Sequence, residues 1–294
     1  MNSANIIAVG EVLWDLFPDG ARFGGAPANF ACHAARLGAN VTIASAIGDD
    51  DQGQTALEIL QSFGIDTQHV QIDPTFSTGR VNVLLDSNGK PTFEIDPDAA
   101  WDHLRSTPAL EECAANSDAI YFGTLAQRNP QSRTAMRKLL KAVLESKENP
   151  TIQRILDINL RPPFCCEASI RESVHLASVL KMSDEELDQV CSACEVFSTG
   201  DHETRTRQLL LDYDLDRVVV TRGPKGAFMV TKDGIFSHPG IATRIIDTVG
   251  AGDAFTAGLV VGILDAMPDD SILRYACSIA AKACSHAGGV PLSD

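Results

Sequence analysis

Short apolar runs alternate with amphipathic stretches along most of the chain. Runs bounded by turn residues predict strands at 6–9, 41–48, 119–123, 155–159, 179–182, 217–221, 228–230 and 234–236. Apolar residues at helical spacing predict helices at 24–37, 55–63, 131–146, 167–177, 184–191, 203–212, 254–264 and 272–286. Strands separated by helices are typical of a mostly parallel sheet covered on both faces. The sequence therefore predicts an α/β fold.

The hydrophobic period changes to two in the stretches 12–24 and 77–96. Residues 79–86 and 91–95 flank the turn 87–90, which is a β-hairpin signal. Together with a strand around 12–16, this hairpin is expected to form a small sheet over one end of the core, as a lid. No linker or repeat interrupts the chain, so residues 1–294 are expected to form a single domain.

Composition and charge narrow the choice of partners. Hydrophobic residues make up 44% and charged residues 21% of the 294 residues, as in ordinary soluble proteins. The net charge of −15 and the pI of about 4.8 argue against nucleic acid or an anionic membrane as a partner. The sequence shows neither a secretory signal nor an apolar run long enough to span a membrane, so a cytoplasmic location is expected.

The eight cysteines include one C-x-x-C pair, Cys191 and Cys194. No second pair or H-x-x-x-H lies at zinc-finger distance. Packing thiols are therefore favoured over metal ligands or a redox pair, which stay the alternatives.

The segment 247–255 contains the residues best suited to chemistry. Ile245 and Ile246 are expected to end a strand, and Gly250 and Gly252 lead into an apolar helix. The unpaired N–H groups of a helix N-terminus favour an anion such as a phosphate, which glycines allow to approach. Asp253 beside such an anion is suited to be a general base, or else it caps the helix.

The segment 247–255 resembles the C-terminal signature of the PfkB carbohydrate kinases, also called the ribokinase-like family. Residues 24–38 resemble the family's N-terminal signature, and residues 47–53 the segment that follows it. Further matches occur in the family's order at 157–162, 181–187 and 220–227. The resemblance implies a ribokinase-like three-layer α/β/α fold with a small β lid, and an ATP-dependent sugar kinase with an alcohol group as acceptor.

The resemblance also implies roles for individual residues. Asp253 would be the catalytic base, and the amides of Gly250, Ala251 and Gly252 would form the anion hole. The sugar would bind to Asp15, Gly25, Asn29, Arg161 and Asp253. Asn29 is equally suited to start a helix, and Arg161 could hold the sugar, neutralise a phosphate or form a surface salt bridge.

ATP and cations complete the set of implied ligands. The nucleotide would contact Lys181, Ser183, Thr221, Arg222, Gly223, Gly226 and Gly252. The helix 272–286 would lie beside the adenine. Mg²⁺ would be organised through water by Glu186, and a monovalent cation, K⁺, by Asp247. Ser183 replaces the family's usual asparagine, and Ser183 with Glu186 also reads as a capping box.

Fructose is the expected acceptor because the segments 10–15, 24–29 and 157–161 look most like fructokinases. The acceptors of 2-keto-3-deoxygluconate kinases and ribokinases are the alternatives, and a homodimer through the lid is a further expectation. Two rivals come from other classes. A non-catalytic sugar sensor would not need Asp253, and a dinucleotide-binding oxidoreductase would need the G-x-G-x-x-G that is missing after the first strand.

Overall fold

The computed structural model describes residues 3–85, 91–146, 149 and 151–290. Its main sheet has nine strands in the order β13-β12-β11-β10-β9-β8-β1-β4-β5. From β11 to β5 the neighbouring strands are parallel, whereas β12 and β13 continue the sheet as an antiparallel hairpin. The strands are β1 (Asn5–Val9), β4 (Asn40–Gly48), β5 (Val70–Asp73), β8 (Ala119–Gly123), β9 (Gln153–Asp157), β10 (Val179–Ser183), β11 (Arg217–Thr221), β12 (Ala227–Thr231) and β13 (Ile235–His238).

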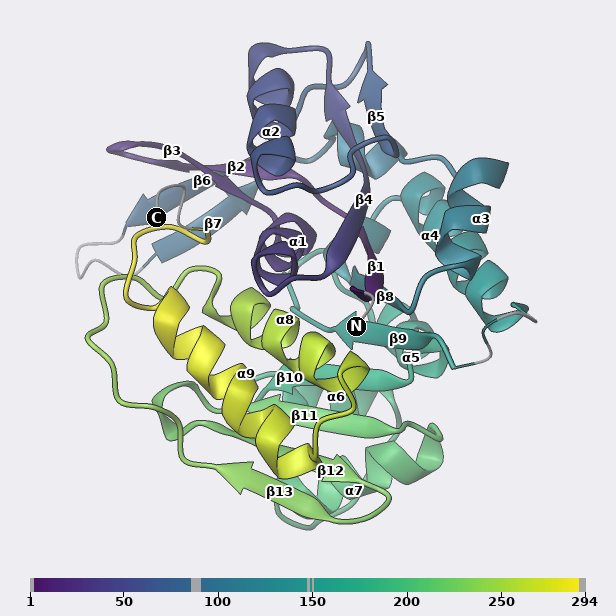
Figure 1. Cartoon of the computed structure of the whole chain (residues 1–294), viewed down its shortest axis with the longest axis vertical. Helices are drawn as coiled ribbons and strands as arrows, with labels where there is room; N and C mark the ends of the chain where they lie inside the picture. Colours follow the sequence, from purple (N-terminus) through teal and green to yellow (C-terminus); the bar gives the residue numbers. More distant parts are fainter. Residues whose placement is uncertain (1–2, 86–90, 147–148, 150, 291–294) are drawn as a thin grey trace.

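Helices cover both faces of this sheet (Figure 1). Alternation along β1 divides the core, since Ile7 and Val9 belong to one apolar cluster and Ile6 and Ala8 to the other. The first cluster includes side chains of α3 (Pro108–Ala115), α4 (Pro130–Leu144), α5 (Glu167–Leu176), α6 (Leu187–Ala193) and α7 (His202–Asp212). The second includes side chains of α1 (Ala26–Arg36), α2 (Asp51–Ser62), α8 (Ala251–Leu264) and α9 (Asp269–Ala283). The layers are therefore helix, sheet and helix.

A second sheet of four strands extends from the main body at the left of Figure 1. Its order is β3-β2-β6-β7, with β2 (Leu13–Phe17), β3 (Gly20–Gly24), β6 (Gly79–Leu85) and β7 (Pro91–Ile95). The predicted hairpin is confirmed as β6 and β7, while its predicted turn 87–90 lies outside the described residues. Because β2 follows the carboxyl end of β1, the small sheet begins at the edge of the main sheet where ligands of α/β proteins bind.

Several predicted boundaries were wrong. Ile245 and Ile246 are not in a strand but in an irregular segment, 61% and 58% exposed, since no neighbouring strand pairs with them. The helix predicted at 55–63 begins at Asp51, because the Gly53 N–H donates to the Asp50 carboxylate (2.8 Å) and so caps it earlier. The sequence analysis also missed β5 and α3.

All eight cysteines are free thiols, and Cys191 and Cys194 are buried. Within the described ranges, no cluster of three or more His, Cys, Asp or Glu side chains is arranged to hold a metal ion. None of the described helices has the length and apolar character needed to cross a membrane.

Candidate active site

The N-terminus of α8 is shaped by glycine. Gly250, which precedes the helix, has a left-handed backbone (φ 72°), and a side chain there would collide with Gly289. The Ala251 N–H donates to the Thr248 carbonyl (3.2 Å). In the described part of the chain, the N–H groups of Gly252 and Asp253 have no hydrogen-bond partner. Two free donors at the positive end of a helix dipole are suited to bind an anion.

Asp253 is the third residue of α8 and does not cap it. No side chain caps this helix, and the Asp253 carboxylate instead accepts a hydrogen bond from the Asn29 amide (2.9 Å). The capping alternative is therefore wrong. Burial and the neighbouring negative charge of Asp157 raise the pKa of Asp253 to about 7, against the Asn29 hydrogen bond and the positive charges of Lys181 and Arg161.

A buried ion pair lies beneath this turn. The Lys181 ammonium donates to both carboxylate oxygens of Asp157 (3.1 and 3.0 Å), and Asp157 also accepts from the Thr256 hydroxyl (2.8 Å). Burial lowers the pKa of Lys181, but the carboxylates of Asp157, Glu186 and Asp253 outweigh it, so the net shift is upward. A Cβ on Gly252 would lie 3.2 Å from the Lys181 nitrogen. A fixed positive charge therefore supports the anion site from below.

A polar cavity of about 450 Å³ opens on one side of Asp253. Its wall combines strands of the small sheet, the start of α1, the loop after β9 and the start of α8. The five residues predicted to bind sugar all line it, namely Asp15, Gly25, Asn29, Arg161 and Asp253. Lys181, which the resemblance assigned to the nucleotide, lines this cavity too. The fold thus brings together residues that are far apart in the sequence.

The sequence reading assigned no role to Glu11, which also lines the polar cavity. Its side chain is 3% exposed, and one carboxylate oxygen, Oε2, has no hydrogen-bond partner in the described structure. Burial raises the pKa of Glu11 to about 7, although nearby N–H groups and the charges of Arg161 and Arg128 oppose the rise. An acidic residue two positions after the buried strand β1 was a usable signal, because such positions lie at the ligand-binding edge.

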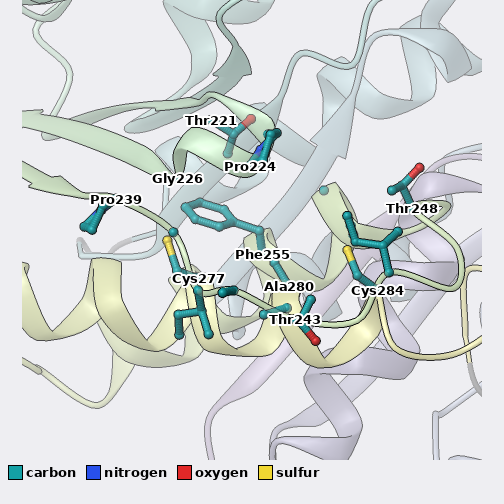
Figure 2. Close-up of a pocket in the computed structure, with 18 residues that line it drawn as sticks. Thr221, Pro224, Gly226, Pro239, Thr243, Thr248, Phe255, Cys277, Ala280 and Cys284 are labelled. Atoms are coloured by element: carbon teal, nitrogen blue, oxygen red, sulfur yellow. The ribbon is translucent and has the colours of Figure 1, made fainter.

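A larger, mainly apolar cavity of about 670 Å³ opens on the other side of the α8 N-terminus (Figure 2). Phe255 of α8 lies between Thr221 and Pro224 on one side and residues of α9 on the other (Figure 2). The α9 side is formed by Cys277, Ala280, Ala281 and Cys284. Thr248 and Gly252 line both cavities, which therefore meet at the helix N-terminus.

Some of the residues predicted to bind nucleotide line this apolar cavity, namely Thr221, Gly223, Gly226 and Gly252. Arg222 does not line either cavity, because its guanidinium donates to the Ala227 carbonyl (3.4 Å) and the Ser237 hydroxyl (3.2 Å). These contacts brace the β11–β12 turn.

Ser183 and Glu186 also lie outside both cavity walls. The Glu186 carboxylate accepts from the Ser183 N–H (2.8 Å), the Ser183 hydroxyl (2.9 Å) and the Leu160 N–H (2.6 Å). This is half of the predicted capping box, but α6 begins only at Leu187, so the serine ends β10 rather than capping the helix. Glu186 ties the end of β10 to the loop that follows β9.

Asp247 and Arg161 occupy different surroundings. The Asp247 carboxylate accepts from the N–H groups of Val249 (3.0 Å) and Gly288 (2.8 Å), which joins the loop before α8 to the segment after α9. Arg161 is exposed and lines the polar cavity, and its guanidinium donates to the Leu160 carbonyl (3.1 Å) but forms no salt bridge with any side chain in the described ranges. The surface salt-bridge alternative for Arg161 is therefore wrong.

Known proteins are similar to this chain in sequence and in fold. The pattern of the pfkB family of carbohydrate kinases matches residues 19–293. Fructokinase-2 of Oryza sativa subsp. japonica is 29% identical over 92% of this chain and 82% of its own. Aminoimidazole riboside kinase of Salmonella typhimurium is 27% identical over 94% and 86% of the two chains. The structure of fructokinase from Vibrio cholerae O395, with fructose, ADP and calcium bound, superposes with a TM-score of 0.82 at 28% identity, covering 97% and 94%.

These matches span nearly the whole chain and agree with the α/β fold and its mostly parallel sheet. The kinases of this family are phosphotransferases that act on an alcohol group. The chain therefore belongs to the PfkB family of carbohydrate kinases and has a ribokinase-like fold.

Proposed function

We propose that the protein transfers the γ-phosphate of ATP to a hydroxyl group of a small sugar, with fructose as the expected acceptor. The observation that carries this proposal is the position of the Asp253 carboxylate, which lines the polar cavity at the helix turn where the apolar cavity begins. An acceptor hydroxyl on one side and a terminal phosphate on the other would meet at this carboxylate. Membership of the family leaves no support for the oxidoreductase alternative.

Asp253 is suited to be the general base. A base works best when its pKa lies near the working pH, and the pKa of this carboxyl is raised to about 7. The hydrogen bond from Asn29 fixes one carboxylate oxygen, and the other remains for the hydroxyl proton. As the hydroxyl oxygen attacks the phosphorus, its proton passes to Asp253, and the bond between the γ-phosphate and ADP breaks.

The groups around Asp253 are suited to stabilise the transferred phosphate. The free N–H groups of Gly252 and Asp253 and the ammonium of Lys181 supply positive charge at one point. Preorganised donors of this kind stabilise the charge that develops in the transition state. Together they offset the strong negative charge of the whole protein, which would otherwise repel ATP.

The two cavities suit the two substrates. The polar cavity offers carboxylates, two amides and two cationic side chains, which are suited to hydrogen-bond to sugar hydroxyls. The apolar cavity offers alanine, isoleucine, proline and phenylalanine side chains, against which a flat base packs. Its proximity to the α8 N-terminus would direct the phosphates toward Gly252.

Mg²⁺ is the metal expected with ATP, and the residues present fit a loosely held ion. The Glu186 carboxylate is already bound by Ser183 and Leu160, so it would act on the ion through water rather than directly. Mg²⁺ keeps several waters and is commonly held by substrate phosphates and one or two carboxylates. Bound there, the ion would neutralise phosphate charge. We likewise propose, from the family resemblance, that K⁺ binds near Asp247.

Fructose is favoured over other acceptors by the relatives. Fructokinases of rice and of Salmonella typhimurium are each 29% identical to the chain, and the Vibrio fructokinase structure contains fructose. The relative that acts on aminoimidazole riboside shows that a nucleoside is the acceptor to test against it.

The test is a coupled assay of ADP release with fructose, ribose, 2-keto-3-deoxygluconate, glucose and nucleosides, each with Mg-ATP. We expect ADP release with fructose at the highest kcat/KM, and the loss of most of it in Asp253→Asn. Sugar binding without any ADP release would instead favour the non-catalytic sensor. A faster reaction with another acceptor would keep the kinase and replace fructose.

A further inference from the structure

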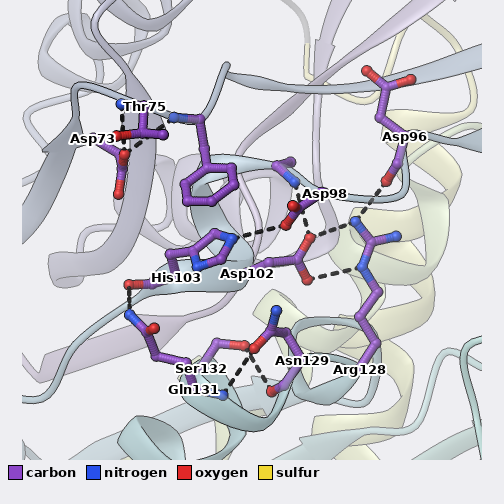
Figure 3. A network of polar contacts seen from close by, with 12 residues as sticks. Asp73, Thr75, Asp96, Asp98, Asp102, His103, Arg128, Asn129, Gln131 and Ser132 are labelled. Atoms are coloured by element: carbon purple, nitrogen blue, oxygen red, sulfur yellow. Dashed lines mark hydrogen bonds and ion pairs between the residues drawn. The ribbon is translucent and has the colours of Figure 1, made fainter.

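Arg128, which has no role in the site as proposed above, is at the centre of a buried polar cluster (Figure 3). The Arg128 guanidinium donates to both carboxylate oxygens of Asp102 (2.8 and 2.6 Å), and the same pair is a salt bridge. The side chains are only 6% and 1% exposed. A planar, bidentate pair of this kind fixes the orientation of the arginine more strictly than a lysine could.

Two aromatic rings enclose the same guanidinium. Its central carbon lies 4.1 Å from the centre of the Trp101 ring and 4.6 Å from the centre of the Phe164 ring. Trp101 is 1% exposed and also supports the small sheet, since a side chain on Gly79 of β6 would collide with its indole. Arg128 is therefore packed between the base of the small sheet and the segment that contains Phe164.

Arg128 contacts three segments that line the polar cavity, and the first of these is the small sheet. Its guanidinium donates to the Asp96 carbonyl (2.6 Å), and the Asp96 N–H donates to the Arg80 carbonyl in β6 (3.0 Å). Ile95 and Val81, which precede Asp96 and follow Arg80, both line the cavity. The bond from Arg128 thus holds the point where both strands return to the main body.

The second segment is the loop after β9. The Phe164 N–H donates to the Arg161 carbonyl (2.8 Å), so the ring that packs on Arg128 belongs to the same tight turn as Arg161. Arg161 lines the cavity and is one of its two cationic side chains. A shift of the Phe164 ring would therefore move Arg161 relative to the bound sugar.

The third segment is the short 3₁₀ helix Leu125–Gln127. The Arg128 N–H donates to the Leu125 carbonyl (3.1 Å), and the Leu125 side chain lines the cavity. One buried residue thus contacts three separate segments, each of which contributes a side chain to the sugar cavity.

We infer that Arg128 is a positioning residue for the acceptor sugar: it holds the small sheet, the Arg161 turn and the Leu125 helix at the spacing that the sugar requires. This inference rests on the proposed function, since it assigns the acceptor to the polar cavity. Arg128 does not touch the apolar cavity, so its effect falls on the sugar and not on ATP. Small displacements of such supports are costly, because binding groups must stay within a fraction of an ångström of their working positions.

The test compares Arg128→Lys with the wild-type protein in the ADP-release assay. Lysine keeps the positive charge but cannot hold Asp102 and the Asp96 carbonyl together. We expect the KM for the sugar to rise about tenfold or more, in line with the cost of misplaced positioning groups, while the KM for Mg-ATP changes less than about twofold.

Arg217→Lys is the matched control. Arg217 donates to Asp269 through Nε (3.1 Å) and forms a partly buried salt bridge with it, with side chains 24% and 15% exposed. It begins β11, at the end of that strand opposite to the cavity residue Thr221. Loss of this pair weakens the fold without touching the sugar cavity, so both KM values should stay as in the wild type.

Four outcomes are distinguishable. A rise in the sugar KM that is specific to Arg128→Lys supports the inference. Unchanged KM values, or an equal rise for both substrates, would overturn it and give Arg128 a purely structural role. If Arg128→Lys does not fold, Phe164→Leu decides, because it leaves the ion pair intact and must still raise the sugar KM. Absence of sugar-dependent ADP release by the wild type would contradict the proposed function instead.

Discussion

The two cavities that meet at Gly252 differ in how they are built. The polar cavity takes its side chains from at least four separate segments and contains three carboxyl groups, those of Glu11, Asp15 and Asp253. The apolar cavity is lined mainly by α9 and by the segments around residues 221–226 and 239–248. Its groups are small or apolar and carry no charge.

This difference suggests how one enzyme can combine a cavity that is selective for its ligand, the polar one, with a cavity that tolerates variation in its ligand, the apolar one. Directional hydrogen bonds reject a ligand whose hydroxyl groups are misplaced, because an unpaired buried polar group costs about 1–3 kcal/mol. Apolar contact depends on area and shape and tolerates small errors. We therefore expect substitutions in the polar cavity to affect the acceptor and the chemical step strongly, and those in the apolar cavity to affect ATP more weakly.

The largest effect is expected for Asp253→Asn. The amide cannot accept the hydroxyl proton, so kcat should fall by a factor of about 10² or more, the scale of a lost general base. Steady-state kinetics measure kcat, and isothermal titration with Mg-ATP serves as the control for an intact apolar cavity. Normal turnover by the variant would remove Asp253 from the chemistry.

Asn29→Leu should be next in size. The change keeps a side chain of similar length and branching but removes the hydrogen bond that the Asn29 amide donates to Asp253. We expect the sugar kcat/KM to fall about 10- to 100-fold, the range for one lost bond to a charged group. The KM for Mg-ATP should stay within about twofold. Equal losses for both substrates would contradict the division between the cavities.

The pH dependence of the reaction tests the role of Asp253 in the polar cavity without a mutation. With a pKa of about 7, Asp253 is ionised above neutral pH and becomes protonated as the pH falls through 7. The value of kcat/KM for the sugar should therefore fall about tenfold per pH unit below 7. Glu11, whose pKa is also about 7, titrates in the same range, and its need for ionisation would make the slope steeper. A profile flat down to pH 5 would exclude a base with this pKa.

Ala280→Leu should have a smaller effect, confined to the nucleotide. Ala280 is half-buried in α9 and lines the apolar cavity, and leucine is a good helix former. The larger side chain should occupy space for the base and raise the KM for Mg-ATP about fivefold to tenfold, the cost of modest overpacking. The sugar KM measured at saturating Mg-ATP is the internal control, and a selective rise in that KM would reverse the assignment of the cavities.

The smallest effect is a change of stability with pH. The pKa of Asp253 is raised on folding, from 3.8 to about 7, so the folded state binds the extra proton and loses stability as the pH rises between these values. Asp253→Asn should therefore be more stable than the wild type at pH 8, by on the order of 1 kcal/mol, and this advantage should shrink at pH 5. Urea unfolding at both pH values measures the difference. Ala280→Leu should show no such pH dependence.

The sequence predicted which residues line the polar cavity more completely than it predicted the contacts among them. The motifs identified Asp15, Gly25 and Asn29, which line the cavity together with Asp253. The bond from Asn29 to Asp253 joins residues 224 positions apart, so no local pattern could reveal it. The strand predicted at 155–159 ends earlier, at Asp157, because Asn159 has a left-handed backbone (φ 39°) that leaves the extended conformation.

Arg128 shows the limit of the sequence reading most clearly. It lies between the predicted strand 119–123 and the predicted helix 131–146, and no motif of the sequence includes it. Its role depends on Asp102, Trp101 and Phe164, which come from two other parts of the chain. Only packing brings these groups together.

By itself the sequence determined most of the strands and helices, the α/β class and the glycine-rich turn before α8, because hydrophobic period and glycine conformation act over a few residues. The tertiary structure decided between the alternative roles that the sequence left open for polar residues such as Asp253. It showed that Asp253 accepts from Asn29 instead of capping, and that its pKa is raised, because burial and the nearness of Asp157 depend on how distant segments pack.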